Sequence, residues 1–304
     1  MRKLESKVLV GILMVACGAA KASEFIPNDF YTTHYSSNTI NHFDSSGTMV
    51  DSVAIPDPLA EDIRGLAFGP DGLLYAVAER DSGFAVLALD ANGHVQQTFT
   101  YTTNYIGGNS SYGKIAFDNQ NQFYVGGGGG LVSFDVGSPT SGALIHNEGT
   151  YDVEALPSGN LILVTSNDLI EITNSGSLVR NIDPVGITFT ENRGVEYDPS
   201  TNNIFVTMLG HSGAQFQLMK LNGDTGQLLS SVAHTYADDM FLTSDGRLIV
   251  GSSSQSPAFF TTDPEYVSSF AGDDQVFVTQ YVPEPATALL LGLGTVFVAS
   301  RRRR

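Results

Sequence analysis

The chain of 304 residues contains one cysteine, no tryptophan and six scattered histidines. The cysteine, Cys17, lies in an apolar segment near the N-terminus, so the remaining chain has no disulfide and no thiolate nucleophile. No two histidines stand at metal-ligand spacing, which argues against a histidine-based metal centre. A redox or cofactor-binding protein is therefore disfavoured, because its usual ligand residues are missing.

Basic residues are also scarce outside the two ends of the chain. Residues 23–282 contain seven Lys and Arg against 30 Asp and Glu. Nucleic-acid binding depends on basic contacts to phosphates, so this composition argues against a nucleic-acid partner. A cation, a neutral glycan or a basic partner fits better, and solubility alone is the simplest explanation of the charge.

Long apolar runs occur only near the two ends. Arg2, Lys3 and Lys7 precede the first run, Val8 to Ala20, and small residues follow at Ala20 and Ala22. This order predicts a signal peptide over residues 1–22, cleaved by signal peptidase after Ala22. The residues leading to Cys17 also resemble a lipoprotein-processing sequence, so lipidation of Cys17 is an alternative.

Between these ends the sequence consists of short apolar runs separated by turn-forming residues. The stretch from Asp62 to Phe99 has four such runs, with Gly, Pro, Asp and Asn in the gaps. It predicts one antiparallel sheet of four strands. The runs are residues 65–68, 73–78, 84–89 and 95–99.

The same pattern recurs along the chain. Its first strands, aligned as residues 66–68, 115–117, 154–156, 195–197 and 240–242, begin 49, 39, 41 and 45 residues apart. Four-stranded units at this period predict a β-propeller, with a sandwich or a solenoid of hairpins as the alternative. Residues 29–56 supply only three strands, and an additional strand is expected over residues 275–281. If these pair, the two ends share a sixth blade, which closes the ring and removes a free sheet edge.

The segment RGLAFGPDGLLYAVAE, followed by VLALDANG, resembles the NHL and SMP-30/gluconolactonase-like six-bladed propellers over about residues 29–281. The resemblance implies an all-β fold of six four-stranded antiparallel blades, and says less about activity. The lactonase-like families use a Glu, Asn and Asp set on the propeller axis. The nearest equivalents here are Glu154, Asn192 and either Asp238 or Asp239.

The loops before the innermost strands are expected to open at this axis. Asp152, Glu154, Asn192, Asp238 and Asp239 then form a candidate metal site, because oxygen ligands suit Ca²⁺ and metal-assisted hydrolysis. The alternative is that these carboxylates lie in solvated loops and bind nothing.

The sequence changes character after Tyr281. Pro283, Glu284 and Pro285 precede an apolar segment, Ala288 to Ala299, and the chain ends in Arg301, Arg302, Arg303 and Arg304. We expect a single hydrophobic helix, short for a full span, with its arginines on the cytoplasmic side. This three-part order resembles the PEP-CTERM sorting signal over residues 282–304, with an ordinary retained anchor as the alternative. The resemblance implies processing by an exosortase in a Gram-negative bacterium that makes exopolysaccharide or biofilm matrix.

The sequence thus predicts a signal peptide (1–22), a propeller (23–281) and a sorting tail (282–304). The protein is expected to be tethered to the inner membrane by its tail and then to reach the cell surface or the extracellular space. The leading hypothesis is a non-catalytic binding or structural module for exopolysaccharide or a surface protein. The alternative is a metal-dependent hydrolase or lactonase with its site on the axis.

Overall fold

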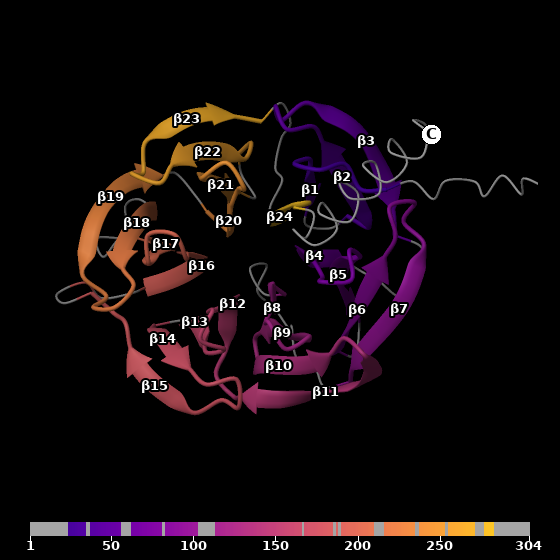
Figure 1. The fold of residues 1–304 in the computed structure, drawn as a ribbon, viewed down its shortest axis with the longest axis horizontal. Coiled ribbons are helices and arrows are strands. Elements are labelled where there is room, and N and C mark those ends of the chain that lie inside the picture. Colours follow the sequence, from indigo (N-terminus) through magenta and orange to yellow (C-terminus); the bar gives the residue numbers. More distant parts are fainter. Residues whose placement is uncertain are drawn as a thin grey trace, which may run out of the picture.

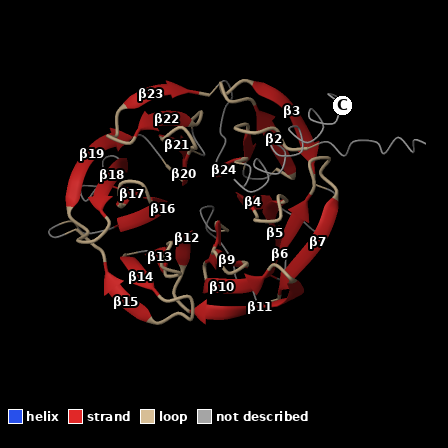
Figure 2. Cartoon of the chain, viewed as in Figure 1, coloured by secondary structure: helices blue, strands red, loops and turns tan. Residues whose placement is uncertain are grey.

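The computed structural model describes residues 24–34, 37–55, 62–80, 83–102, 113–165, 167–184, 187, 190–209, 216–234, 237–252, 255–270 and 277–282. Within these ranges all regular structure is β-strand, and the strands form six four-stranded sheets arranged as a ring (Figure 1). Figure 2 shows the same ring without any helix in the described part of the chain. The predicted six-bladed propeller is confirmed.

Every blade has the same antiparallel order from the axis outward, and we number the blades along the chain. Blade 1 joins the last strand to the first three, β24 (Phe277–Gln280), β1 (Phe30–Thr33), β2 (Thr39–Phe43) and β3 (Met49–Ala54). Blade 2 contains β4 (Asp62–Phe68), β5 (Leu74–Arg80), β6 (Gly83–Leu89) and β7 (Val95–Tyr101). Blade 3 contains β8 (Ile115–Phe117), β9 (Gln122–Gly127), β10 (Gly130–Asp135) and β11 (Ser138–His146).

The remaining blades complete the ring. Blade 4 contains β12 (Thr150–Ala155), β13 (Leu161–Thr165), β14 (Leu169–Ile172) and β15 (Leu178–Asn181). Blade 5 contains β16 (Thr190–Asp198), β17 (Asn203–Leu209), β18 (Phe216–Asn222) and β19 (Leu228–His234). Blade 6 contains β20 (Asp239–Leu242), β21 (Arg247–Gly251), β22 (Ala258–Thr261) and β23 (Tyr266–Ser269).

The tight turns form because their side chains bond to their own backbone. Asp44 accepts the N–H of Ser46 at 2.9 Å, and Asp90 accepts the N–H of Asn92 at the same distance. Each turn ends on a glycine with positive φ, 83° at Gly47 and 76° at Gly93, which other residues rarely adopt. These local interactions let short apolar runs reverse direction and pair as neighbouring strands.

The chain ends share blade 1, as the sequence predicts. Strand β24 pairs with β1 in an antiparallel register that places Thr279 opposite Tyr31. Beside this pair, the N–H of Asn28 donates to the carbonyl of Tyr281 at 2.9 Å. The predicted strand over residues 275–281 is observed at 277–280, and residues 271–276 lie outside the described ranges. Pairing the two ends removes an unpaired inner edge from the ring.

The core lies between the faces of adjacent blades. All seven residues of β6 are buried, whereas the outer strand β3 is mostly exposed. In the largest cluster the ring of Phe123 stacks on Phe134 and meets Phe99 edge-on, both at centroid distances of 4.9 Å. Because middle strands are covered on both faces, they appear in the sequence as continuous apolar runs.

The predicted alignment of the third repeat is wrong by one residue. Phe68, the last residue of β4, pairs with Leu74, and Ala155, the last residue of β12, pairs with Leu161. In both blades the two paired residues are six positions apart in the sequence. The equivalent of residues 66–68 is therefore 153–155 rather than 154–156. The error matters because successive side chains of a strand point to opposite faces.

The ends of the chain lie outside this description. Residues 1–23 and 283–304, including the predicted signal peptide and the apolar segment of the tail, are not among the described residues. Of the residues that are described, none belongs to a helix with the length and apolar character of a membrane span.

Candidate ligand-binding site on the propeller axis

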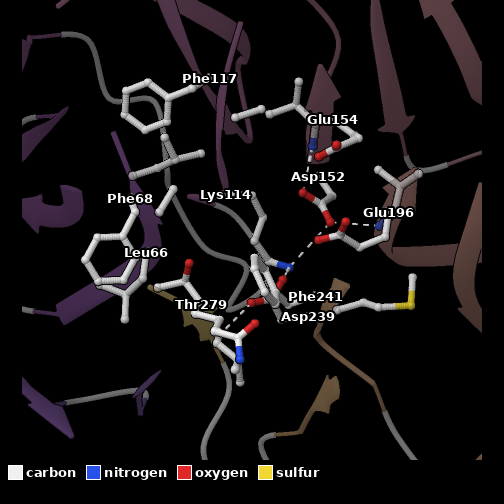
Figure 3. A pocket seen from close by; sticks show the side chains of 18 of the residues that line it. Leu66, Phe68, Lys114, Phe117, Asp152, Glu154, Glu196, Asp239, Phe241 and Thr279 are labelled. Atoms are coloured by element: carbon white, nitrogen blue, oxygen red, sulfur yellow. Dashed lines mark hydrogen bonds and ion pairs between the residues drawn. The ribbon is translucent and has the colours of Figure 1, made fainter. Parts of the chain in front are cut away.

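The six inner strands surround a cavity of about 250 Å³ on the axis (Figure 3). Residues at one equivalent position of the six inner strands form a layer around it. Five of them precede the last residue of their strand by one, and Glu196 precedes Asp198 by two because β16 is one residue longer at this end. This layer comprises Ala67, Ala116, Glu154, Glu196, Phe241 and Thr279.

A second layer, nearer the start of the inner strands, bounds one end of the cavity. The ammonium of Lys114 donates to the carboxylate of Asp239 and lies 3.6 Å from Oδ2 of Asp152. Only 4% of the Lys114 side chain is exposed. Lys114 belongs to blade 3 and Asp239 to blade 6, so the interaction crosses the axis (Figures 1 and 3).

Backbone N–H groups hold both aspartates in place. Oδ1 of Asp152 accepts the N–H of Val153 at 2.7 Å, and Oδ2 accepts the N–H of Val195 in blade 5 at 2.8 Å. Oδ2 of Asp239 accepts the N–H of Val278 in blade 1 at 2.9 Å. Each carboxylate is therefore bonded to the inner strand of the next blade, and charge-assisted bonds of this kind are strong.

One ammonium lies between two carboxyl groups in this layer, so Lys114 offsets the charge of one of them. Burial tends to lower the pKa of Lys114, but the carboxylates of Asp152, Asp239 and Asp238 outweigh burial and raise it. Burial and the charge of Asp239 raise the pKa of Asp152 to about 7, although Lys114 and the two N–H donors act in the opposite direction. Lys114 stays protonated at neutral pH and serves as a built-in cation between two carboxylates.

Glu154 and Glu196 lie on the cavity wall beyond this layer (Figure 3). Burial, with a contribution from Asp152, raises the pKa of Glu154 to about 8. Burial and then the charge of Glu154 raise the pKa of Glu196 well above its ordinary value. Across the described residues, no Lys, Arg or His forms an ion pair with either carboxyl group. Glu154 therefore retains its proton near neutral pH.

The cavity opens at its other end. It shares Phe68, Phe117 and Val282 with a wider hollow of about 520 Å³, which the turns after the inner strands surround. Val282, the last described residue, lies at this opening, which we call the tail-side mouth. The axis is thus bounded by the Lys114 layer at one end and open on the tail side at the other.

The structure brings three of the five predicted axial residues together, namely Asp152, Glu154 and Asp239. Asp238 is buried outside the cavity lining, with its N–H bonded to the carbonyl of Gly251 at 2.9 Å. The side chain of Asn192 lies outside the described residues.

The donor set does not fit a Ca²⁺ ion between Asp152 and Asp239, because the Lys114 ammonium lies there. Among described side chains, no group of three or more His, Cys, Asp and Glu is arranged to hold a metal ion. Because the side chain of Asn192 is not described, the five-residue calcium site as a whole stays a prediction from the sequence, and no chemical step is derived through it.

Sequence reasoning missed Lys114 and Glu196. Lys114 lies three residues before the end of its inner strand, and Asp152 and Asp239 lie at the same position in their blades. Glu196 shares the position of Glu154 once the third repeat is shifted by one residue. An alignment on the turns, rather than on apolar triplets, would have revealed both.

The tail that starts at the cavity mouth decides how the protein is handled by the cell. Residues 282–304 match the model of the PEP-CTERM protein-sorting motif. The chain carries an exosortase sorting signal. A PEP-CTERM protein is exported, and its C-terminal tail anchors it transiently until an exosortase processes it. The predicted residues of the motif, Pro283 to Pro285 and Arg301 to Arg304, all fall within the match.

Solved structures with the same fold share little sequence with this PEP-CTERM protein. A chain of a nidogen/laminin complex has a TM-score of 0.63 and 14% identity, covering 83% of this chain and 97% of that one. A protein from Desulfotomaculum acetoxidans has a TM-score of 0.55 and 10% identity, covering 84% and 100%. Hydrazine synthase from Kuenenia stuttgartiensis has a TM-score of 0.53 and 16% identity, covering 81% and 80%. No curated protein matches the sequence. These likenesses concern the fold alone.

Proposed function

We propose that this PEP-CTERM protein is a non-catalytic binding module that takes a ligand into its axial cavity at the cell surface or in the extracellular matrix. The observation that carries the proposal is the cavity of about 250 Å³, closed by the Lys114 layer and open at the tail-side mouth. A preformed concave site with a few polar groups among apolar ones is the usual form of a small-ligand site.

The chemistry of the wall supports binding rather than catalysis. The carboxylates of Asp152 and Asp239 are committed to Lys114 and to backbone N–H groups. The described lining contains no Ser, Cys or His that could act as an activated nucleophile with its base. The layer therefore provides a fixed end wall, whose polar atoms are already bonded to one another and to the backbone.

The export signal supports a partner outside the cytoplasm. Exopolysaccharide and surface proteins are the partners available to a protein processed by an exosortase, and a sugar unit or a side chain could enter the mouth. The neighbour from the nidogen/laminin complex is itself a propeller-like chain taken from a protein assembly. That likeness agrees with a binding role, although fold alone does not assign one.

The proposal is tested by measuring the binding of the purified full chain to exopolysaccharide and to surface proteins of its own host. The variant Ala67→Phe fills the cavity, and the equivalent residue Phe241 shows that phenylalanine is compatible with this strand position. We expect the wild-type chain to bind one of these partners and Ala67→Phe to lose that binding while it stays folded. No binding by the wild-type chain, or unchanged binding by the variant, contradicts the proposal.

A metal-dependent hydrolase or lactonase is the second candidate, because Glu154 and Glu196 are two carboxyl groups of raised pKa in one cavity. Perturbed acids of this kind occur often at catalytic sites. Metal analysis of protein never exposed to chelator tests this candidate. Less than roughly a tenth of an equivalent of divalent metal would contradict it, because each catalytic site needs its own ion.

A further inference from the structure

We propose that the ligand of the axial cavity is a small organic cation, an amine or quaternary ammonium with an apolar body, held by Glu154 and Glu196. This inference rests on the proposed binding function and names its ligand class. It starts from an imbalance in the cavity wall, which carries four carboxyl groups, of Asp152, Asp239, Glu154 and Glu196, and one ammonium, of Lys114.

In the described part of the wall, the two glutamates are the carboxyl groups without any cation beside them. Lys114 offsets the charge of one of the two aspartates, and both aspartates are also bonded to backbone N–H groups. Glu154 makes no hydrogen bond or ion pair with any other described residue, and its carboxyl group faces the cavity (Figure 3). A carboxyl group that is partly removed from water and lacks a cation keeps its proton. A positively charged ligand would supply the missing charge in place of that proton.

The opposite wall is suited to the organic part of such a ligand. Leu66, Phe68 and Phe117 lie together across the cavity from Glu154 and Glu196 (Figure 3). Aromatic faces attract alkylammonium groups, and apolar walls stabilise the carbon skeleton. A cavity of about 250 Å³ admits a small molecule, or one unit of a larger one.

Other ligand classes fit the wall less well. Ca²⁺ requires six to eight oxygen ligands, and no metal-binding group was found among the described side chains. A neutral sugar could donate and accept hydrogen bonds with protonated carboxyl groups, but it would not release their protons. Proton release therefore distinguishes a cationic ligand from a neutral one.

Binding of a cation and release of a proton from Glu154 are coupled, so the affinity depends on pH in a known direction. Because burial raises the pKa of Glu154 to about 8, a cation that binds below this pH must displace a proton, and the cost decreases as the pH rises. The affinity for a cation therefore increases with pH through this range. The affinity for a neutral ligand of the same shape stays constant or decreases.

The test compares choline with its uncharged carbon isostere, 3,3-dimethylbutan-1-ol, by calorimetry on the full chain. We expect choline to bind at least about tenfold more tightly than the isostere, and about a hundredfold more tightly near pH 9 than near pH 6. We also expect proton release near pH 7, seen as a heat that depends on the ionisation enthalpy of the buffer.

Two variants link these effects to the site. E154Q/E196Q should lose the preference for choline and its pH dependence while still binding the isostere, which shows that the cavity is intact. E265Q removes one exposed carboxylate and should behave like the wild-type chain.

Equal affinities for the two probes, choline binding without proton release, or no choline binding all overturn the inference. The outcome remains distinct from that of the proposed function. If a host partner still binds and Ala67→Phe abolishes that binding, the cavity is a binding site for a neutral or anionic ligand, and only the cationic class is wrong.

Discussion

The ammonium of Lys114 in blade 3 reaches across the propeller axis to the carboxylate of Asp239 in the opposite blade (Figure 3). Asp152 of blade 4 lies beside the same ammonium, and the two aspartates bond to Val195 of blade 5 and Val278 of blade 1. One buried cation thus connects five of the six blades at the centre of the ring. The network therefore links blades that are not neighbours in the ring.

Removal of this cation should destabilise the whole propeller. Lys114→Met leaves Asp152 and Asp239 buried without a positive partner, which typically costs about 3–5 kcal/mol. Urea unfolding of the full chain measures the loss. The triple variant K114M/D152N/D239N should recover part of it, since no uncompensated charge remains. A loss below about 1 kcal/mol in Lys114→Met would show that the network does not hold the ring.

Stability should fall as the pH rises because of Glu154. Its pKa is about 8 in the folded protein and close to the ordinary 4.5 when unfolded. Between these values the folded state binds more protons, so the free energy of unfolding decreases as the pH increases. E154Q should weaken this dependence, to which Asp152 and Glu196 still contribute, and should be more stable near pH 8 by an amount on the order of a few kcal/mol. Thermal unfolding of both proteins across this range, with E265Q as the control, measures the effect. An unchanged pH slope in E154Q would contradict the prediction.

The shared blade should depend on His42. Its two ring nitrogens lie 2.8 Å from Asp29 and 3.0 Å from Asp51, so one side chain of β2 ties the chain before β1 to β3. The side chain of Asp29 is 9% exposed and that of Asp51 is 63% exposed. His42→Ala leaves Asp29 buried without its partner and should cost about 1–3 kcal/mol.

The matched control is Asp51→Asn, which should cost less than about 1 kcal/mol because the carboxylate of Asp51 is solvent-exposed. Hydrogen exchange of β1 and β24 should accelerate in His42→Ala before the other blades respond. Equal losses in the two variants would show that burial of Asp29 is not the reason.

Gly65 should not accept a side chain. A Cβ at this position would lie 1.9 Å from the carbonyl oxygen of Gly113, next to Lys114. Gly65→Ala must displace one strand or the other and should cost about 1–3 kcal/mol or more. Gly72→Asn is the control, because a Cβ there meets nothing within 4 Å and asparagine tolerates positive φ. The free energies of unfolding of the two variants compare the effects, and equal values would contradict the steric argument.

Processing should require the tripeptide at the start of the sorting motif. Pro283, Glu284 and Pro285 directly follow Val282, at the start of the matched segment. Glu284→Ala should leave the tailed form in the membrane fraction of the native host. Mass spectrometry of the membrane-bound and released forms measures this, and release at the wild-type rate would contradict the prediction.

The fold could be predicted from the sequence because its turns depend on interactions between residues close together in the chain. Turns such as Asp44 to Gly47 and Asp90 to Gly93 are formed by residues only a few positions apart. Their period therefore predicted four-stranded blades, and the missing strand at one end predicted the shared blade. The sorting motif was equally legible, because its order of tripeptide, apolar segment and arginines lies within one short segment.

The site could be predicted only in part from the sequence, for two physical reasons. A shift of one residue moves a strand side chain to the other face, so the misaligned third repeat concealed that Glu154 and Glu196 are equivalent. Lys114 and Asp239 are separated by 125 residues, and nothing in either sequence neighbourhood indicates the other. The sequence by itself determined the blades, their closure and the tail, because turn and strand preferences act over short distances. Only the closed ring decided that the carboxylates predicted as metal ligands would meet a lysine, since opposite blades approach each other only at the axis.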